Sequence, residues 1–591
     1  MLQMTQQLLD RRIEAVLETV QKPSRYIGGE ANQVLKPTAT SLVALCYPDA
    51  YEVGISNQAL QILYAQVNAR DAFAAERVYC PWPDMGDAMR REGIPLFTLE
   101  SWRPVREADL LGITLQAELT YSNVLEVLDL SGIPVRAEDR GEDDPIVLAG
   151  GPSASNPAPM APFFDAFFMG ESEEAFELVL DAIALGGGRA ARLARLAELP
   201  CVYVPSAGVR PVERAIYAEF GIETQPTRVV VPYSSAIFSR ASVEVMRGCT
   251  RGCRFCHAGT WYRPVRERPA DEVIKAGIEQ LSCTGYDELS LTSLATSDYT
   301  DVIAAIEGIK AERPELHLSL PSNRVDTGPV AMTAAANSRQ SSITLAPEAA
   351  TQRMRDIICK TITGEMIEGA IEAAFKAGYT SLKTYFMIGL PRETHAEVQG
   401  IVDLGIRARE IGREIKGRGG RFSVHVSVSN FVPKPHTPFQ WEGMSSRDQL
   451  EAKQTYMRRA MPTRQIRLSM HDVRTSMLEG ALSRGDRRTA SVIELAWRNG
   501  ARFDAWTEMF QEQAWHDAFT AEGTTMDAEA TREFGEWDEL PWDNVQSGVS
   551  TEFLLDEWQQ SKADRATGDC RWDGCADCGA CFGPVRNKLV R

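Results

Sequence analysis

The sequence predicts an α/β protein with two parallel sheets, followed by a mainly helical C-terminal region. Strand-like and helix-like segments alternate through the first 185 residues, and six further strand–helix units follow between residues 236 and 465. Alternation of this kind is typical of parallel sheets covered by helices. Seven of the 12 cysteines gather in two short groups. Such grouping indicates metal binding, not a disulfide framework.

Composition sets the broad class of the protein. The 591 residues are enough for several globular domains, and hydrophobic residues make up 44% of them. No run of 18 apolar residues is present, so no membrane span is expected, and residues 1–21 read as an acid-bearing amphipathic helix, not a signal peptide. A reducing, cytoplasmic location follows from the grouped cysteines. The net charge of −18 argues against a broad basic surface.

The first domain is expected at residues 37–185, after a helix and loop at residues 1–36. Predicted strands cover residues 41–46, 109–115, 145–149 and 165–169, and predicted helices cover 57–69, 121–131 and the segment after 172. A doubly wound sheet binds ligands beyond the carboxyl ends of its strands. The loops found there carry these candidate residues: Thr114, Asn123, Gly150, Gly151, Gly170 and Glu171.

The second sheet is expected at residues 236–465, after a connector at 186–235. Strands are predicted at 242–246, 288–293, 316–320, 341–346, 381–388 and 422–430. Helices are predicted at 271–283, 299–312, 327–337, 363–376, 393–412 and 447–460. Six units, not eight, predict a partial (β/α)6 barrel that is open on one side.

A loop with three cysteines follows the first strand of this barrel. Cys249, Cys253 and Cys256 form a C-x3-C-x2-C array, with Phe255 before the last cysteine. Three thiolates within eight residues can hold one metal centre, one ligand short of a closed site. A [4Fe-4S] cluster held in this way leaves one iron open. The alternative is a zinc site whose fourth ligand is distant or is His257.

The loop and the strands around it resemble those of the radical S-adenosylmethionine (SAM) enzymes. The resemblance implies that the amino and carboxylate groups of SAM occupy the open iron, and that an electron donor such as flavodoxin or ferredoxin reduces the cluster. The loops at the strand ends then supply candidate SAM contacts. These are Thr292, Ser293, Glu348, Arg355 and Gly389, with Phe255 in the cluster loop; glycine at 389 permits close approach to the adenine.

The first domain resembles the cobalamin-binding domain that precedes the core in many radical SAM proteins. The glycine pair Gly150–Gly151 and the Gly170–Glu171 turn carry this resemblance. Segments 76–85, 429–441 and 483–488 match one large branch of the superfamily, from about residue 20 to 581. No histidine precedes His257, so this domain offers no imidazole to cobalt. The alternative is a Rossmann-like domain without a cofactor.

The C-terminal part is predicted as a helical region at 466–565 and a cysteine-rich tail at 566–591. The tail contains C-x4-C-x2-C-x2-C, formed by Cys570, Cys575, Cys578 and Cys581. Four thiolates in twelve residues fit zinc or a second iron–sulfur cluster, and the absence of a stable metal is also open.

These features predict a cytoplasmic radical SAM enzyme that cleaves SAM to a 5′-deoxyadenosyl radical. With cobalamin on the first domain, the expected reaction is methyl transfer to an unactivated carbon. Without cobalamin, thiolation or rearrangement is the alternative, including on RNA or a ribosomal protein; basic groups at 407–421 and 484–488 leave a local RNA contact open. A non-catalytic metal-cluster scaffold is the competing class.

Overall fold

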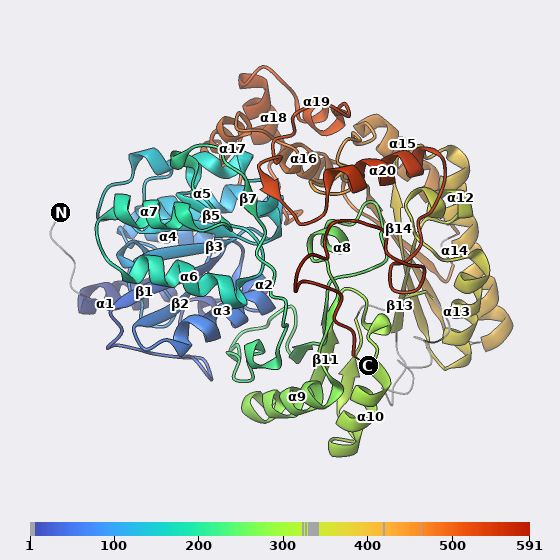
Figure 1. Cartoon of the computed structure of the whole chain (residues 1–591), viewed down its shortest axis with the longest axis horizontal. Helices are drawn as coiled ribbons and strands as arrows, with labels where there is room; N and C mark the ends of the chain where they lie inside the picture. The colour runs from blue at the N-terminus through green and yellow to red at the C-terminus, as the bar shows by residue number, and fades with distance from the viewer. Residues whose placement is uncertain are drawn as a thin grey trace.

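The computed structural model describes residues 6–321, 324–325, 328, 342–417, 420–462 and 464–590. The chain forms two α/β units side by side, and the C-terminal helices lie above their junction (Figure 1). This arrangement confirms the predicted class: a doubly wound first domain, a second unit of parallel strands, and a mainly helical C-terminal region.

The first sheet has the strand order β2-β1-β3-β4-β5-β6, with β6 antiparallel to its neighbour. This order is flavodoxin-like, and its topological switch point lies between β1 and β3. The strands are β1 (Ser41–Tyr47), β2 (Phe73–Tyr79), β3 (Leu110–Thr114), β4 (Ile146–Gly150), β5 (Ala166–Phe168) and β6 (Val202–Tyr203). The helices are α1 (Gln6–Leu17), α2 (Tyr51–Gly54), α3 (Gln58–Ala69), α4 (Pro83–Glu92), α5 (Tyr121–Leu130), α6 (Ser172–Ala184) and α7 (Arg189–Glu198).

Strand β2 was absent from the sequence prediction, although every residue in it is buried. Its sequence holds Glu76 and Arg77, which break the apolar pattern of a buried strand. Arg77 is fully buried between Glu30 and Glu100, and its Nε lies 2.6 Å from Glu100. Glu76 accepts a hydrogen bond of 2.6 Å from Ser101. Because each charge has a partner, the strand can lie inside the domain.

The second unit contains two parallel sheets with the orders β12-β11-β8 and β13-β14-β15-β16. Its strands are β8 (Ala241–Glu244), β11 (Glu288–Thr292), β12 (His317–Ser319), β13 (Ser342–Glu348), β14 (Ser381–Ile388), β15 (Ser423–Asn430) and β16 (Ile466–Met470). A short antiparallel pair, β9 (Met246–Arg247) and β10 (Arg266–Glu267), flanks the cysteine loop. The six predicted strands are therefore confirmed within the described residues, with the first one divided into β8 and β9.

Seven helices accompany these strands in the described residues, and all but α8 and α12 correspond to helices that the sequence predicted. They are α8 (His257–Trp261), α9 (Ala270–Thr284), α10 (Val302–Glu312), α12 (Gln352–Ile357), α13 (Gly364–Lys376), α14 (His395–Lys416) and α15 (Arg447–Ala460). The helix predicted at 327–337 and the start of the strand predicted at 341–346 lie outside the described residues.

The C-terminal region is mainly helical, but it begins with a strand. Residues 466–470 form β16, which pairs with β15 and continues the sheet beyond residue 465, where the core was expected to end. The remaining elements are α16 (Val473–Ser483), α17 (Thr489–Arg498), α18 (Glu512–Ala521), α19 (Met526–Thr531), β17 (Val545–Gln546) and α20 (Thr551–Lys562). Strand β17 pairs with β7 (Val212–Glu213) of the connector.

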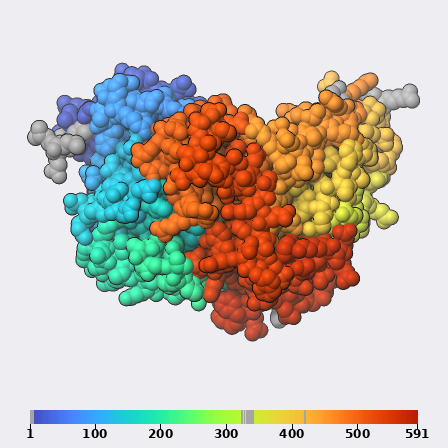
Figure 2. Space-filling view, turned by 90° about the horizontal axis from the view of Figure 1, so that it is seen from above, coloured from blue at the N-terminus to red at the C-terminus, as the bar shows by residue number. Residues whose placement is uncertain are grey.

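The C-terminal helices fix the first domain relative to the barrel. Trp506 donates a hydrogen bond of 2.9 Å to Asp49, and Trp497 donates one of 3.0 Å to Glu126. Viewed from above, the C-terminal residues cover the junction between the two units (Figure 2). None of the helices within the described ranges combines the length and apolar character that a membrane span requires.

Gly170 provides a test of this packing, because the chain after β5 passes close to the connector there. Its φ is +108°, and an added Cβ would lie 2.2 Å from the carbonyl oxygen of Ala215. Gly170→Ala should therefore cost at least about 3 kcal/mol of unfolding free energy, measured as a shift of the urea midpoint.

Gly285→Ala is the matched control. Gly285 also has a positive φ, +74°, but no atom lies within 4 Å of an added Cβ. Its expected cost is about 1 kcal/mol, from backbone strain alone. Equal losses for the two variants would contradict the close approach at Gly170.

Candidate cofactor-binding site

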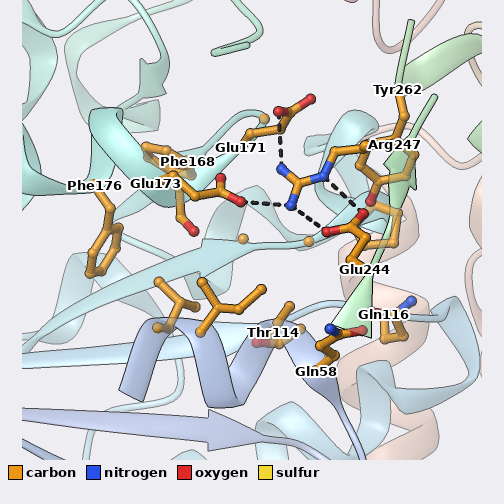
Figure 3. Close-up of a pocket in the computed structure, with 18 of the residues that line it drawn as sticks. Gln58, Thr114, Gln116, Phe168, Glu171, Glu173, Phe176, Glu244, Arg247 and Tyr262 are labelled. Atoms are coloured by element: carbon orange, nitrogen blue, oxygen red, sulfur yellow. Dashed lines mark hydrogen bonds and ion pairs between the residues drawn. The ribbon is translucent and has the colours of Figure 1, made fainter. Parts of the chain in front are cut away.

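A cavity of about 350 Å³ lies at the carboxyl ends of the first-domain strands and against the barrel. Its first-domain wall comes from β1, β3, β4 and β5 and from α3 and α6 (Figure 3). Its other wall comes from the end of β8, the β9 strand, Tyr262 and the end of β11. The cavity therefore lies at the switch point of the first sheet, where such folds bind ligands.

The structure brings five of the six predicted cofactor residues of the first domain to this cavity, but only two of the six predicted in the second unit. Those that line it are Thr114, Gly150, Gly151, Gly170, Glu171, Thr292 and Ser293. Asn123 does not: its side chain accepts a hydrogen bond of 2.7 Å from Phe503 N–H and donates one of 2.9 Å to the Pro48 carbonyl. Asn123 thus holds the C-terminal region against the first domain.

Small residues give the cavity its shape. Gly150 ends β4 in an ordinary backbone conformation, and no atom lies within 4 Å of the Cβ that a larger residue would add. Gly112 in the middle of β3 also lines the space. The inner part is apolar, with Leu45, Ile62, Leu63, Phe168 and Phe176. Among the described residues that line the cavity there is no histidine.

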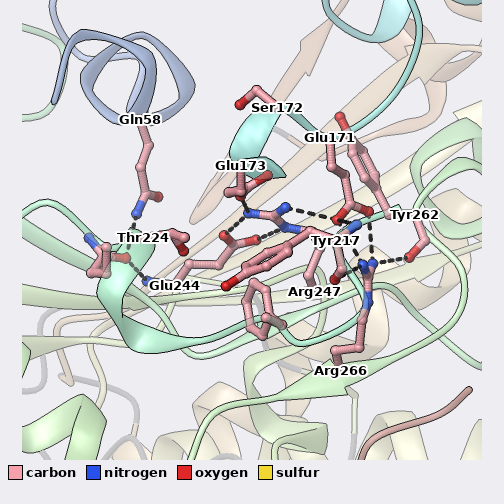
Figure 4. Close-up of polar contacts among 12 residues, drawn as sticks. Gln58, Glu171, Ser172, Glu173, Tyr217, Thr224, Glu244, Arg247, Tyr262 and Arg266 are labelled. Atoms are coloured by element: carbon pink, nitrogen blue, oxygen red, sulfur yellow. Dashed lines mark hydrogen bonds and ion pairs between the residues drawn. The ribbon is translucent and has the colours of Figure 1, made fainter. Parts of the chain in front are cut away.

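Glu171 is the centre of a charged network in the wall between the units (Figure 4). Its side chain is 2% exposed and accepts hydrogen bonds of 2.7 and 2.9 Å from Arg266 and one of 3.0 Å from Arg247. Arg214 lies 3.6 Å away. Burial alone would raise the pKa of Glu171, but the cations of Arg247 and Arg266 outweigh burial and lower it. Glu171 therefore joins the two units as an ionised carboxylate.

Arg247 continues this network into the cavity wall. Besides Glu171, it contacts Glu173 at 2.6 Å and Glu244 at 2.7 Å. Sequence analysis did not identify Arg247, because no motif marks it. Its position two residues before Cys249 links the carboxylates around the cavity directly to the cysteine loop.

The three predicted cluster cysteines lie together in the loop between β9 and α8. All three are half-buried. Burial raises the pKa of Cys249 to about 12, and the nearby Cys253 adds to this shift. Burial and Cys253 likewise raise the pKa of Cys256 to about 11, although the Gly259 N–H donates to its sulfur at 3.2 Å. Coordination by iron requires the three thiols to lose their protons, so binding and proton release are coupled here.

Glu348 and Lys360 form a polar pair beside these cysteines. Glu348 ends β13 with a φ of +65°, at an irregularity in the pairing with β14. Its carboxylate lies 3.5 Å from the Lys360 ammonium. The pKa of Lys360 is raised: burial alone would lower it, but Glu348, Cys253 and Cys256 outweigh burial. Strained residues of this kind gather at functional sites, and Lys360 was missed because a lone lysine carries no sequence signal.

Three other predicted SAM contacts, Arg355, Gly389 and Phe255, contact neighbouring parts of the protein. Arg355 donates to the carbonyl oxygens of Ala349, Ala350 and Ile362, so it shapes the loop that follows Glu348. Gly389 has a φ of +79°, and an added Cβ would lie 2.7 Å from a methyl of Leu450. Phe255 packs beside the apolar cluster that contains Trp441 and Trp558.

The alternative fourth ligand, His257, has a different partner. Its Nε2 lies 3.2 Å from the Ser155 hydroxyl, and its ring stacks on Trp261. Burial lowers its pKa to about 3, so the imidazole is neutral. Within the described parts of the chain, no three histidine, cysteine, aspartate or glutamate side chains surround a point suited to one metal ion. Geometry alone therefore assigns no metal to the four tail cysteines or to Cys249, Cys253 and Cys256, so the cluster assignment of those three rests on the sequence motif and the family.

Two of the basic residues noted in the sequence, Arg407 and Arg484, are engaged within the protein. Arg407 pairs with Glu368, Glu410 and Glu414. Arg484 is 1% exposed and lies over the ring of Phe534. These contacts offer no specific support for an RNA-binding surface.

Comparison with known proteins identifies the family. Residues 59–205 match the family described as radical SAM proteins, N-terminal, and residues 243–405 match the radical SAM superfamily. The two matches together span just over half of the chain and include the cysteine loop. The chain belongs to the radical SAM superfamily.

Individual relatives are distant. An uncharacterized protein of Methanocaldococcus jannaschii, MJ0966, is 26% identical over 455 residues, which cover 76% of this chain and 90% of the relative. The solved structure of the cobalamin-dependent radical SAM enzyme OxsB, with aqua-cobalamin and SAM bound, is 14% identical. The matched region covers 88% of this chain and 79% of the OxsB chain, and the TM-score is 0.49. Methylornithine synthase matches 41% of this chain with a TM-score of 0.28.

Glu171→Gln tests the network that joins the two units. The substitution leaves Arg266 and Arg214 buried without their carboxylate, so it should cost about 3–5 kcal/mol at pH 7. Because the folded pKa of Glu171 is lowered, its contribution exists above its unfolded pKa and is lost as the pH falls through the folded value. The penalty should therefore shrink below about pH 4.

Urea unfolding of both proteins from pH 3 to pH 8 measures this difference. Glu174→Gln, at an exposed position in the same turn of α6, is the control and should change stability by no more than about 0.5 kcal/mol. A Glu171→Gln protein as stable as the wild type at pH 7 would show that the network does not hold the units together.

Proposed function

We propose that this protein is a radical SAM enzyme that uses cobalamin to transfer a methyl group to an unactivated carbon. The observation that carries the proposal is the shared cavity: the glycine-lined switch point of the first domain faces the strand ends of the radical SAM unit. A cofactor on the first domain would then lie beside the strands that present SAM contacts, with no large domain movement needed.

The cysteine loop supplies the donor set for a [4Fe-4S] cluster. Cys249, Cys253 and Cys256 are the three ligands, and the family assignment makes the open iron the position for SAM. When bound, this pair supplies reductive cleavage of SAM and a 5′-deoxyadenosyl radical. The Gly259 N–H donates to the Cys256 sulfur, which favours its thiolate form.

Groups near the cysteines suit the polar end of SAM. Lys360 is a half-buried cation that can pair with the SAM carboxylate, and Glu348 can accept from the SAM amino group. Their mutual contact of 3.5 Å keeps both charges compensated before SAM arrives. Arg355 lies between them in the chain, and its guanidinium donates to the carbonyl oxygens of Ala349 and Ala350, just after Glu348, and of Ile362, just after Lys360.

The first-domain side of the cavity fits a flat macrocycle such as a corrin. Gly150 leaves backbone open where a ring can approach closely, whereas Gly151 permits the close approach of the Leu115 backbone. The apolar inner part can accept an attached aromatic group. Since no histidine is among the described lining residues, the first domain would leave the lower face of cobalt without imidazole.

The cluster assignment predicts that each of three single substitutions abolishes SAM cleavage. Cys249→Ala, Cys253→Ala and Cys256→Ala each remove one of three ligands, and two thiolates do not hold a cubane. Anaerobically purified variants should lose about four irons per chain and form no 5′-deoxyadenosine. Cys283→Ala, on α9, is the control and should retain both iron and activity. One cluster variant with full activity would refute the assignment.

Gly150→Phe tests cobalamin binding separately from SAM cleavage. An added ring would fill space that is open in the cavity, so affinity for cobalamin should fall at least about tenfold while the iron content is retained. The control is Gly141→Phe, at an exposed position where no atom lies within 4 Å of an added Cβ. Binding is measured from the absorbance of cobalamin that co-elutes with the protein.

Paramagnetic resonance of the cobalt(II) form gives a second readout. Labelling the histidines with 15N should leave the spectrum unchanged, because the first domain provides no imidazole ligand. A changed spectrum would contradict the proposed lower face. A wild-type protein that binds no cobalamin would leave a radical SAM enzyme with an empty Rossmann-like domain, for which thiolation or rearrangement is the proposed chemistry.

A further inference from the structure

The C-terminal tail is tied to the cluster loop just before its four cysteines. Asp569 lies 3.0 Å from Arg251, which stands between Cys249 and Cys253 in the sequence. Two residues earlier, the backbone N–H of Thr567 donates to the buried Cys359 thiol at 3.4 Å, and this thiol donates to the Thr567 carbonyl at the same distance. The tail therefore begins against the loop that holds the proposed cluster.

After its last cysteine, the tail is again held by hydrogen bonds to the segment that follows the cluster loop. The side-chain oxygen of Asn587 accepts a hydrogen bond of 2.9 Å from Val265 N–H, and Lys588 N–H donates to the Val265 carbonyl at 2.8 Å. Asn587 also contacts the Cys570 sulfur at 3.8 Å. Residues 567–588 thus form a loop with both ends anchored to the segment around Cys249–Arg266, and the tail passes beside α8 (Figure 1).

A buried cation, Arg263, lies between the cluster loop and the helix that precedes the tail. Its Nε donates a hydrogen bond of 3.2 Å to the Gly259 carbonyl, three residues after Cys256, and its guanidinium is 3.7 Å from the Cβ position of Gly252 in the cluster loop. The same guanidinium lies 5.6 Å from the ring centroid of Phe553 on α20. A positive charge at this position would weaken the repulsion between two anionic metal centres.

The tail cysteines run from the surface toward this cation. Cys575 and Cys581 are exposed, whereas Cys570 and Cys578 are half-buried, as are the three cysteines of the cluster loop. The backbone of Cys578 is fixed by a hydrogen bond of 2.9 Å from Ser550 N–H to its carbonyl. A protein donor at the surface would meet the tail before it met the cluster loop.

We propose that Cys570, Cys575, Cys578 and Cys581 hold an iron–sulfur centre that relays electrons to the cluster on Cys249, Cys253 and Cys256. The inference rests on the proposed function, since the relay serves SAM cleavage. One electron leaves a low-potential one-electron carrier protein of the flavodoxin or ferredoxin class, resides on the tail centre, and passes to the inner cluster. No bond forms or breaks in this relay, and the carrier is oxidised by one electron each time. Zinc at the tail could not serve, because it has no redox chemistry.

The test compares the wild type, Cys575→Ser/Cys581→Ser and the control Cys283→Ser, all as full-length protein reconstituted anaerobically with iron and sulfide. Iron and zinc contents and the paramagnetic resonance of the reduced proteins are measured first. The rate of 5′-deoxyadenosine formation is then measured with dithionite and with reduced flavodoxin. The two reductants separate the tail from the inner cluster, because a small reductant can reach the inner cluster without the relay.

The wild type and the control should each hold about eight iron atoms per chain, and the double variant about four. The paramagnetic resonance spectrum of the reduced double variant should lack the signals of one cluster. The ratio of the flavodoxin-driven to the dithionite-driven rate should fall at least about tenfold in the double variant only. Zinc in the wild-type tail, unchanged iron in the double variant, or an unchanged ratio would each overturn the inference. If dithionite gives no 5′-deoxyadenosine even with the wild type, the proposed function fails, and the iron content and spectra still decide whether the tail holds a redox centre.

Discussion

The position of the site depends on one buried carboxylate. Glu171 follows β5 of the first sheet, and its partners Arg247 and Arg266 form the strand pair that flanks the cysteine loop. A carboxylate removed from water is stable as an anion only with close cations, and the same is true of the arginines. The network therefore fixes the distance between the first-domain cavity and the cluster loop. Under the proposed function, this contact would hold a cofactor on the first domain at a fixed distance from the cysteine loop.

Much of the fold could be predicted from the sequence because buried parallel strands are continuous apolar runs. The segments at 41–46 and 381–388 have this character, and the strands lie there. The two longest strands that escaped detection did so for physical reasons. Strand β2 carries Glu76 and Arg77. Arg77 can be buried because Glu30 and Glu100 neutralise it, and Glu76 because the Ser101 hydroxyl donates a hydrogen bond to it. Strand β16 reads Ile-Arg-Leu-Ser-Met, and its half-buried pattern depends on pairing with β15, a long-range contact.

Site residues could be predicted from the sequence where the local backbone conformation determines their position. They could not be predicted where packing against distant residues determines it. Glycines at strand ends mark turns, and Gly150 and Gly170 indeed line the cavity. Lys360 acquires its significance from neighbours that are distant or unmarked in the sequence, so nothing local identified it. The reverse holds for Asn123, which lies in a predicted binding loop, yet its amide bonds to Phe503 and Pro48 in the packed interior.

Reductive cleavage of SAM is the central claim, and one measurement tests it directly. The wild-type chain, purified without oxygen and reconstituted with iron and sulfide, is incubated with SAM and dithionite, and 5′-deoxyadenosine is quantified against time by liquid chromatography. The account predicts steady formation of 5′-deoxyadenosine that requires both the reductant and the iron–sulfur cluster. A fully loaded cluster that is reduced by dithionite, binds SAM and yet yields no 5′-deoxyadenosine would contradict it.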